Sequence, residues 1–140
     1  MPDRENVLTV VREWVVKAEN DLTTAAHALT LGPKCPTDTV CFHAQQCVEK
    51  YLKAVLVLHG QDFPKTHDLK RLFALMPVHV RPALTKEEQD QLTDYATGAR
   101  YPGWGEIPLG EARRAVAVAR RVRKEVRALL PKEVLRRRQP

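Results

Sequence analysis

Apolar residues recur every three or four positions over five stretches of the chain, and this spacing predicts five helices and no strand. The expected helices span about residues 4–31, 37–60, 66–76, 85–98 and 109–130. Glycine or proline ends each stretch, at Gly32-Pro33, Gly60, Pro77, Gly98 and Pro131. Because short connections between long helices favour antiparallel neighbours, the sequence predicts an all-α, up-and-down bundle of four or five helices.

Three of the expected helices begin at residues that cap a helix N-terminus well. Thr37 or Asp38 is expected to cap the second helix. Thr66 is expected to begin the third, with His67-Asp68 in its first turn. The run Thr85-Lys86-Glu87-Glu88 has the spacing of a capping box and predicts the start of the fourth.

The second helix is apolar around most of its circumference, which is typical of a buried, central helix. One gap in the apolar coat is filled by polar side chains that share a face, because they are three or four positions apart. These are His43, Gln46, Lys50 and Lys53, with Gln45 and Glu49 beside them. Several donors and acceptors are therefore expected to point one way from the central helix.

Charge is concentrated at the C-terminal end of the 140 residues. Residues 109–140 hold 11 Lys and Arg and 3 Asp and Glu, net +8, whereas residues 1–108 carry net −2. A basic end of this kind suits nucleic acid or an acidic protein face, or it is a solvated helix face followed by a tail. We expect one helical domain over residues 1–131 and a basic tail over 132–140.

Several function classes are disfavoured by what the sequence lacks. No run of 18 apolar residues is present and the first residues lack an apolar core, so we expect neither a membrane span nor a signal peptide, and a cytoplasmic location. The three cysteines do not suggest a disulfide framework, and Cys41 and Cys47 fall on the apolar part of the second helix. Cys41 and His43 diverge on a helix, so we expect no metal site and no cofactor.

Polar side chains from three segments are expected to meet in one ligand-binding cleft. The candidates are Gln46, Glu49, Lys50 and Lys53, then Thr66, His67 and Asp68, then Tyr95, Arg100 and Tyr101. The start of the third helix would offer unpaired N–H groups to an anion, the cations would bind phosphate, and Tyr101 could stack on a base. The alternative is structural: Thr66 only caps a helix, and Glu49 pairs with Lys53.

Three motifs in this order resemble the HEPN family of small helical domains, over about residues 10–130. They are Gln45-Gln46-x-x-Glu49-Lys50-x-Leu52-Lys53, Thr66-His67-x-Leu69, and Tyr95 followed by Arg100-Tyr101-Pro102. The resemblance implies a bundle of four or five helices that is often dimeric and binds a nucleotide or a nucleic-acid end such as RNA. Small members often accompany a separately encoded minimal nucleotidyltransferase in a toxin–antitoxin-like system, so that enzyme is the expected partner protein.

The resemblance also indicates what this chain lacks. Catalytic HEPN proteins are metal-independent ribonucleases with the signature Arg-x(4–6)-His near the start of the last helix. Here Arg100 is followed at those offsets by Gly105, Glu106 and Ile107, and no histidine occurs after His79. We therefore expect a non-catalytic, homodimeric binding module with no catalytic residue. Two alternatives remain: a ribonuclease with a non-standard pair such as His67 with Lys50 or Arg100, and a protein–protein scaffold.

Overall fold

The computed structural model describes residues 3–136, apart from the side chain of Arg100, and this part of the chain contains helices and no strand. The α-helices are α1 (Arg4–Leu29), α2 (Thr37–Leu58), α3 (Leu69–Leu75), α4 (Lys86–Ala96), α5 (Leu109–Leu129) and α6 (Lys132–Leu135). Single 3-10 turns follow α1, α3 and α4, as η1 (Gly32–Lys34), η2 (Val78–Val80) and η3 (Gly98–Arg100). The predicted all-α fold is confirmed, and the five expected helices are all present.

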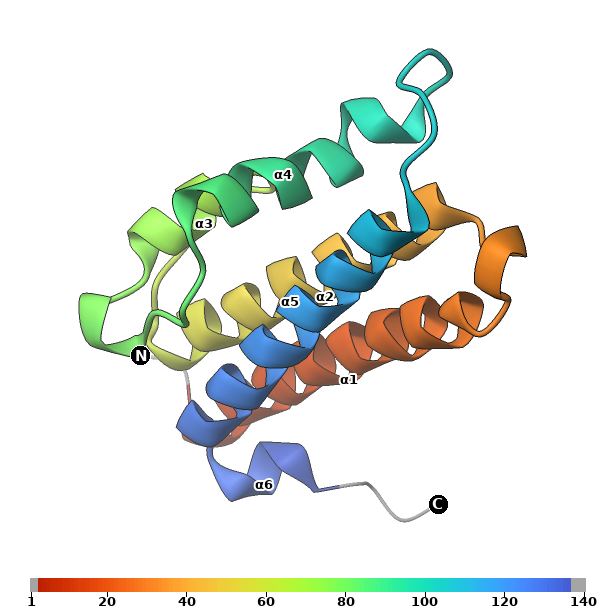
Figure 1. The fold of residues 1–140 in the computed structure, drawn as a ribbon. Helices are drawn as coiled ribbons and strands as arrows, with labels where there is room; N and C mark the ends of the chain where they lie inside the picture. The colour runs from red at the N-terminus through yellow and green to blue at the C-terminus, as the bar shows by residue number, and fades with distance from the viewer. Residues whose placement is uncertain (1–2, 137–140) are drawn as a thin grey trace.

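Four helices make an up-and-down bundle around α2 (Figure 1). The chain runs one way along α1, returns along α2, runs forward again along α4 and returns along α5. The helix α2 packs against α1, α4 and α5. Because α2 and α5 run in the same direction, their N-termini lie at the same end of the bundle, beneath the loop that follows η3.

Burial is greatest in α2, as its apolar pattern predicted. Most of its residues are buried, and Val48, Tyr51, Leu52, Val55 and Leu56 are fully so. Burial of large apolar side chains on several faces is the main contribution to the stability of such a bundle. The hydroxyl of buried Tyr51 donates to Glu19 on α1, which satisfies the one polar atom of that side chain.

The expected start of α3 at Thr66 is wrong. The helix begins at Leu69, and the carboxylate of Asp68 caps it by accepting the N–H of Lys70 at 3.1 Å. The hydroxyl of Thr66 instead accepts the N–H of Asp68 at 3.0 Å and closes the preceding turn. Two good capping residues stand two positions apart, and the structure uses the second as the helix cap. His67 therefore precedes the helix, outside its first turn.

Two further boundaries can be compared with expectation. The capping box at Thr85 is present, since its hydroxyl accepts the N–H of Glu88 at 3.1 Å and the Glu88 carboxylate accepts the N–H of Thr85 at 2.9 Å. The basic tail expected from residue 132 begins as helix α6, which lies against α1. The guanidinium of Arg12 donates to the carbonyl of Glu133 at 2.8 Å and ties the two helices together.

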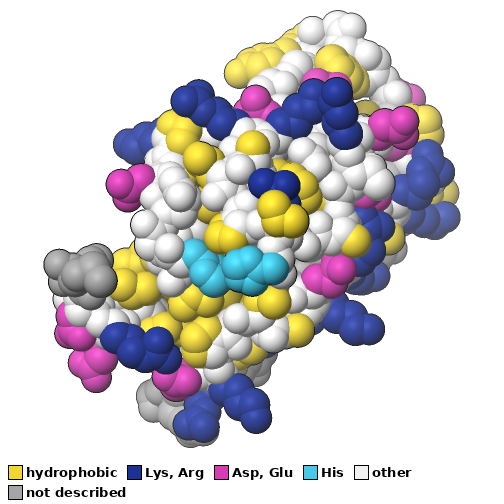
Figure 2. Space-filling view, turned by 90° about the vertical axis from the view of Figure 1, so that its left-hand side faces the viewer, with side chains coloured by type: hydrophobic (Ala, Val, Ile, Leu, Met, Phe, Trp, Pro, Cys, Tyr) yellow, Lys and Arg dark blue, Asp and Glu magenta, His cyan; other side chains and the backbone are white. Residues whose placement is uncertain are grey.

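The end of the bundle formed by the C-terminus of α2 and by η2 carries exposed histidine and apolar side chains. The rings of His59 and His79 pack edge to face with their centroids 6.2 Å apart. Figure 2 views this end and shows histidine side chains surrounded by apolar surface, and Val78 on η2 is 77% exposed. Among residues 3–136, no group of three or more His, Cys, Asp or Glu side chains is placed to hold a metal ion. No helix in the same range is long and apolar enough to cross a membrane.

Candidate functional site

The polar stripe of α2 forms a buried network centred on Glu49. One carboxylate oxygen, Oε1, accepts from Gln45 at 3.1 Å and from Gln46 at 3.5 Å, and lies 2.7 Å from Nδ1 of His67. The other oxygen, Oε2, accepts from Nζ of Lys53 at 3.0 Å. The carboxylate therefore has a donor on each oxygen, which is how a buried charge is stabilised. Four of the ten predicted site residues, Gln46, Glu49, Lys53 and His67, are brought together here.

Lys53 is committed to this network. Its ammonium lies 5.3 Å from the ring centre of Trp14 on α1 and 5.8 Å from that of Phe63, in the segment after α2. Its side chain is 10% exposed. The cation is thus compensated by one carboxylate and two aromatic faces, and it joins three segments of the fold. This placement favours a structural role over phosphate binding.

His67 differs from the rest of the network because its side chain is 51% exposed. Its Nδ1 faces the buried carboxylate of Glu49, so Nε2 is the ring nitrogen that a ligand could reach. A histidine oriented by a buried carboxylate is a recurrent arrangement for proton transfer.

Lys50 joins a second network. Its Nζ lies 2.5 Å from Oδ2 of Asp21 on α1, and Nδ1 of His43 lies 2.7 Å from the other oxygen of the same carboxylate. Lys50 and Lys53 were expected in one cleft, but one pairs with α1 and the other with Glu49 on its own helix. Asp21 was missed by sequence reasoning. Its only signal was an acidic residue beside the apolar stripe of the first helix.

Tyr95 is also internal. It is buried, and its hydroxyl donates to Oε2 of Glu111 at 2.7 Å, which links α4 to α5. Burial, together with this hydrogen bond, raises the pKa of the Tyr95 phenol well above its ordinary value. The side chain of Arg100 lies outside the described part of the structure. Thr66 and Asp68 form the turn and cap described above.

The loop before α5 presents aromatic surface. Tyr101 is 65% exposed and Trp104 is 48% exposed, whereas Ile107 is buried. The ring of Trp104 lies against Gly98, where an added Cβ would come within 3.0 Å of it. A side chain at position 98 would therefore displace the Trp104 ring. The loop thus holds one face of Trp104 and leaves aromatic area open to solvent.

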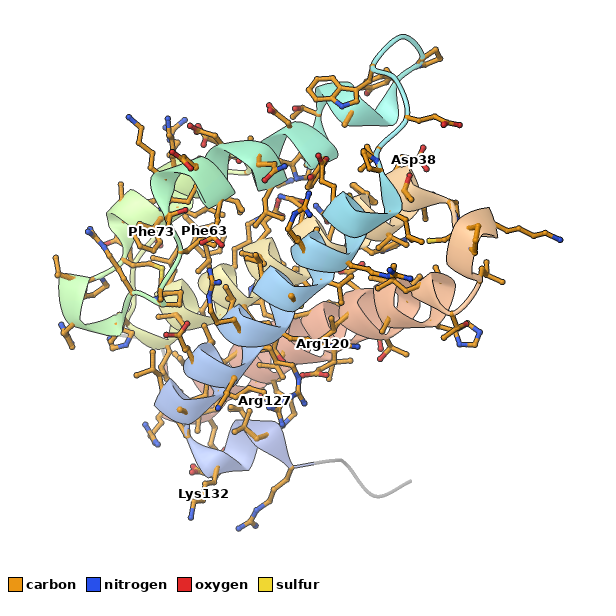
Figure 3. The ribbon with its side chains drawn as sticks, in the orientation of Figure 1. Asp38, Phe63, Phe73, Arg120, Arg127 and Lys132 are labelled. Carbon is orange, nitrogen blue, oxygen red and sulfur yellow. The ribbon has the colours of Figure 1, made fainter. Side chains whose placement is uncertain are left out.

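The outer face of α5 is basic. Arg113, Arg120 and Lys124 are exposed and lie on one face because they are seven and four positions apart. None of the three has a hydrogen-bond or ion-pair partner within residues 3–136. Figure 3 shows Arg120 and Arg127 leaving α5 on the same side. The arginines expected on the polar side of the fifth helix are therefore present.

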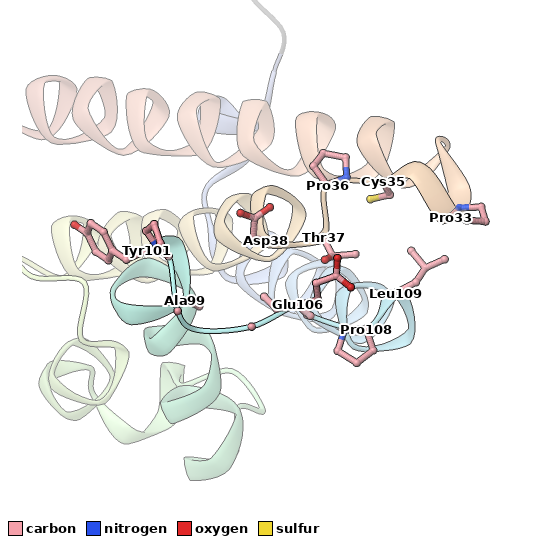
Figure 4. A pocket seen from close by; sticks show the side chains of 14 residues that line it. Pro33, Cys35, Pro36, Thr37, Asp38, Ala99, Tyr101, Glu106, Pro108 and Leu109 are labelled. Carbon is pink, nitrogen blue, oxygen red and sulfur yellow. The ribbon is translucent and has the colours of Figure 1, made fainter.

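A pocket of about 810 Å³ lies between this loop and the start of α2 (Figure 4). Its wall includes Tyr101 and Glu106 from the loop and Cys35 and Asp38 from the other side. Burial raises the pKa of the Cys35 thiol, and the nearby positive charge of Arg113 opposes that shift. Leu109, the first residue of α5, also lines the pocket, so the pocket adjoins the start of that helix. The carboxylates of Asp38 and Glu106 make the interior of the pocket suited to a ligand that donates hydrogen bonds. The positive charge of Arg113 lies on α5.

Of the ten predicted residues, the structure therefore unites four around Glu49, pairs Lys50 with Asp21, buries Tyr95 against Glu111 and places Tyr101 on the pocket. The pocket itself was missed, because its other wall comes from residues 33–38, which carry no recognisable binding motif.

Comparisons with known proteins give a family and a structural relative. A family model described as "HEPN domain" matches residues 11–129. The crystal structure of TT1696 from Thermus thermophilus is similar, with 27% sequence identity and a TM-score of 0.70. The similarity covers 86% of this chain and 98% of that one. No curated protein matches the chain.

Proposed function

The chain belongs to the HEPN domain family, as its three motifs indicated, and we propose that it is a non-catalytic member that binds a nucleotide or the end of a single-stranded RNA. The base would enter the pocket between the loop and α2, and the phosphates would lie on the basic face of α5. The observation that carries this proposal is the position of exposed Tyr101 on a pocket whose lining includes Leu109, the first residue of the basic helix α5. The coarser role, a helical module of a nucleotide- and RNA-related family, follows from membership alone.

The pocket suits a nucleoside better than a phosphate. Asp38 and Glu106 can accept hydrogen bonds from the amino groups of a base or the hydroxyls of a ribose, but they repel phosphate. Tyr101 on the wall offers a ring on which a base can stack. Every base has a π-face, so such a site can accept any of the four bases. This lack of base preference is expected of a site that binds the end of a single strand.

The basic face of α5 suits the phosphates that follow the base. Arg113, Arg120 and Lys124 extend along the helix for about 16 Å, at about 1.5 Å per residue. Two or three nucleotides of an extended strand span a similar length. Arginine can bind phosphate through two parallel hydrogen bonds. Of the residues predicted from sequence, we propose that Arg100 and Tyr101 contact the ligand, while those around Glu49 hold the bundle that supports the loop.

The test is fluorescence anisotropy with a 5′-labelled oligouridylate. We expect Tyr101→Ala to weaken binding by about 1–3 kcal/mol, the usual contribution of one stacked base. Arg113→Glu should weaken binding at least tenfold and reduce its dependence on salt. The matched control is Lys17→Glu, an exposed lysine on α1 that lies away from the pocket lining. Equal losses in Arg113→Glu and Lys17→Glu would show non-specific attraction and contradict the proposal.

A second candidate function is RNA cleavage centred on His67. The observation that favours it is the contact between Nδ1 of His67 and the buried carboxylate of Glu49, in a histidine whose side chain is 51% exposed. Against it stand the missing Arg-x(4–6)-His signature and the pairing of Lys50 with Asp21. We expect the purified protein not to cut single-stranded RNA. Cleavage that disappears in His67→Ala, but persists in the exposed-histidine control His59→Ala, would establish the enzyme instead.

We further propose that the chain forms a homodimer and works with a minimal nucleotidyltransferase in a toxin–antitoxin-like system. Val78 is 77% exposed at the end of the bundle where Figure 2 shows apolar surface, and this supports self-association, since apolar patches often mark interfaces. Sedimentation at micromolar concentration tests the dimer, and a monomeric mass would contradict it.

Co-expression with a nucleotidyltransferase from a neighbouring reading frame tests the proposed partner. If the two proteins do not co-purify, this pairing is contradicted. If the protein is instead a protein–protein scaffold, it should bind the nucleotidyltransferase and should not bind RNA.

A further inference from the structure

A second groove, of about 420 Å³, lies between α1, α5 and α6, away from the pocket beside Tyr101. Its sides carry four arginines, Arg12, Arg123, Arg127 and Arg136. Glu19 is the one acidic residue among those that line it within the described chain. The groove is therefore strongly positive, with three more cations than anions.

Three of the four arginines are held in place and still have donors that are not used within the fold. Glu19 accepts from Nε of Arg123 at 2.6 Å and from Nη1 of Arg127 at 3.2 Å, and Arg12 donates through Nη2 to the carbonyl of Glu133. Each guanidinium has five N–H donors, so most of them remain for a ligand. Fixed donors lose little freedom on binding a carboxylate or a phosphate.

The apolar residues that line the groove favour a ligand that carries carboxylates over a nucleic acid that carries phosphates. The floor of the groove is aliphatic, with Val16 on α1 50% exposed and Val134 and Leu135 contributed by α6. No aromatic side chain lines it among the described residues. A single-stranded nucleic acid would need aromatic rings on which to stack its bases. A ligand with aliphatic side chains flanked by carboxylates would complement both the aliphatic floor of the groove and its arginine-bearing walls.

We propose that this groove binds an acidic segment of a partner protein, one that places aliphatic side chains on Val16 and Leu135 and carboxylates on the arginine walls. A second copy of this chain does not fit as a symmetric partner, because a two-fold axis through the groove would bring its positive walls against each other. The four residues after Arg136 do not fit either, since residues 137–140 contain Arg137 and Arg138 and no acid.

The test is selection of random 12-residue peptides displayed on phage, using the full-length protein as bait. Peptides are kept if they bind the wild type, and their affinity is then measured for Val16→Asp, which adds a carboxylate to the groove. The matched control is Val10→Asp, which changes another exposed valine on α1, outside the groove. Circular dichroism melting checks that both variants fold.

We expect the selected peptides to combine Asp or Glu with Leu, Ile or Val. Their affinity should fall at least tenfold in Val16→Asp and in Arg136→Glu, and less than twofold in Val10→Asp and in Arg113→Glu. Three results would overturn the proposal: selected peptides without excess negative charge, equal losses in Val16→Asp and Val10→Asp, or no enrichment. A labelled oligouridylate that loses affinity in Val16→Asp and displaces the peptides would reassign the groove to nucleic acid.

Discussion

Replacing Glu49 with leucine is the most informative perturbation of this fold, because the buried carboxylate is the common acceptor of its network. The side chain is 3% exposed, receives hydrogen bonds from Gln45 and Gln46 and an ion pair from Lys53, and lies 2.7 Å from Nδ1 of His67. In Glu49→Leu the ammonium of Lys53 stays buried without its counter-ion. Gln46 keeps a second acceptor, since it also donates to the amide oxygen of Gln45 at 2.6 Å.

The expected decrease in the free energy of unfolding comes mainly from the buried charge of Lys53, which loses its counter-ion. Removing one member of a buried ion pair commonly costs about 3–5 kcal/mol. The rings of Trp14 and Phe63 still face the cation and offset part of this cost, by about 1 kcal/mol. The free energy of unfolding should therefore fall by about 3 kcal/mol. With a urea m-value of about 2 kcal/mol per M, this moves the unfolding midpoint by about 1.5 M.

The measurement is urea unfolding followed by helical circular dichroism. Glu13→Gln is the control, since Glu13 is an exposed acid on α1, and its effect should stay below about 0.5 kcal/mol. Adding Lys53→Met to Glu49→Leu removes the uncompensated charge. The double variant should therefore be more stable than Glu49→Leu alone. A Glu49→Leu protein destabilised by less than about 1 kcal/mol would refute this reasoning, as would a double variant less stable than the single one.

Three further predictions concern the thiols, a cap and an acid. Burial raises the pKa of Cys41 to about 12 and also raises that of Cys47, so both thiols should leave Ellman's reagent unreacted in the native protein at neutral pH and react once it is denatured. Thr85→Ala should lower the free energy of unfolding by about 1 kcal/mol in urea titrations, because it removes the capping box. Burial tends to raise the pKa of Glu88, but bonds from Thr85 and Arg121 outweigh it and hold that pKa below its ordinary value. The resulting stabilisation is present above the unfolded-state pKa and is lost as pH falls through the folded-state value, so Glu88→Gln should show a shallower loss of melting temperature in acid.

The sequence predicted the bundle well because its signals were local. Apolar periodicity and the glycines and prolines that end each stretch are sufficient to place long helices. The start of α3 was missed because Thr66 and Asp68 are both good caps, and choosing between them requires the surrounding turn. Helix α6 was missed because four residues are too few to show a period.

The candidate site was harder to predict because polar side chains take their partners from other helices. Lys50 and Lys53 are three positions apart, which separates their directions by about 60° around the helix axis. That difference is enough for one to reach Asp21 on α1 and the other to lie between Trp14 and Phe63. Shared spacing predicted a shared face, but the packing of α1 decided which neighbour each lysine meets.

The bond between Arg12 and the carbonyl of Glu133 has a consequence for when the arginine groove exists during synthesis. Part of its lining comes from α1, and the rest comes from α5 and α6, which follow about a hundred residues later in the sequence. A nascent or C-terminally truncated chain therefore has α1 without Val134 and Leu135 beside it. A protein that docks in this groove would recognise only chains in which α6 has been made and has packed against α1, so assembly with that partner would follow synthesis and folding of every element that lines the groove.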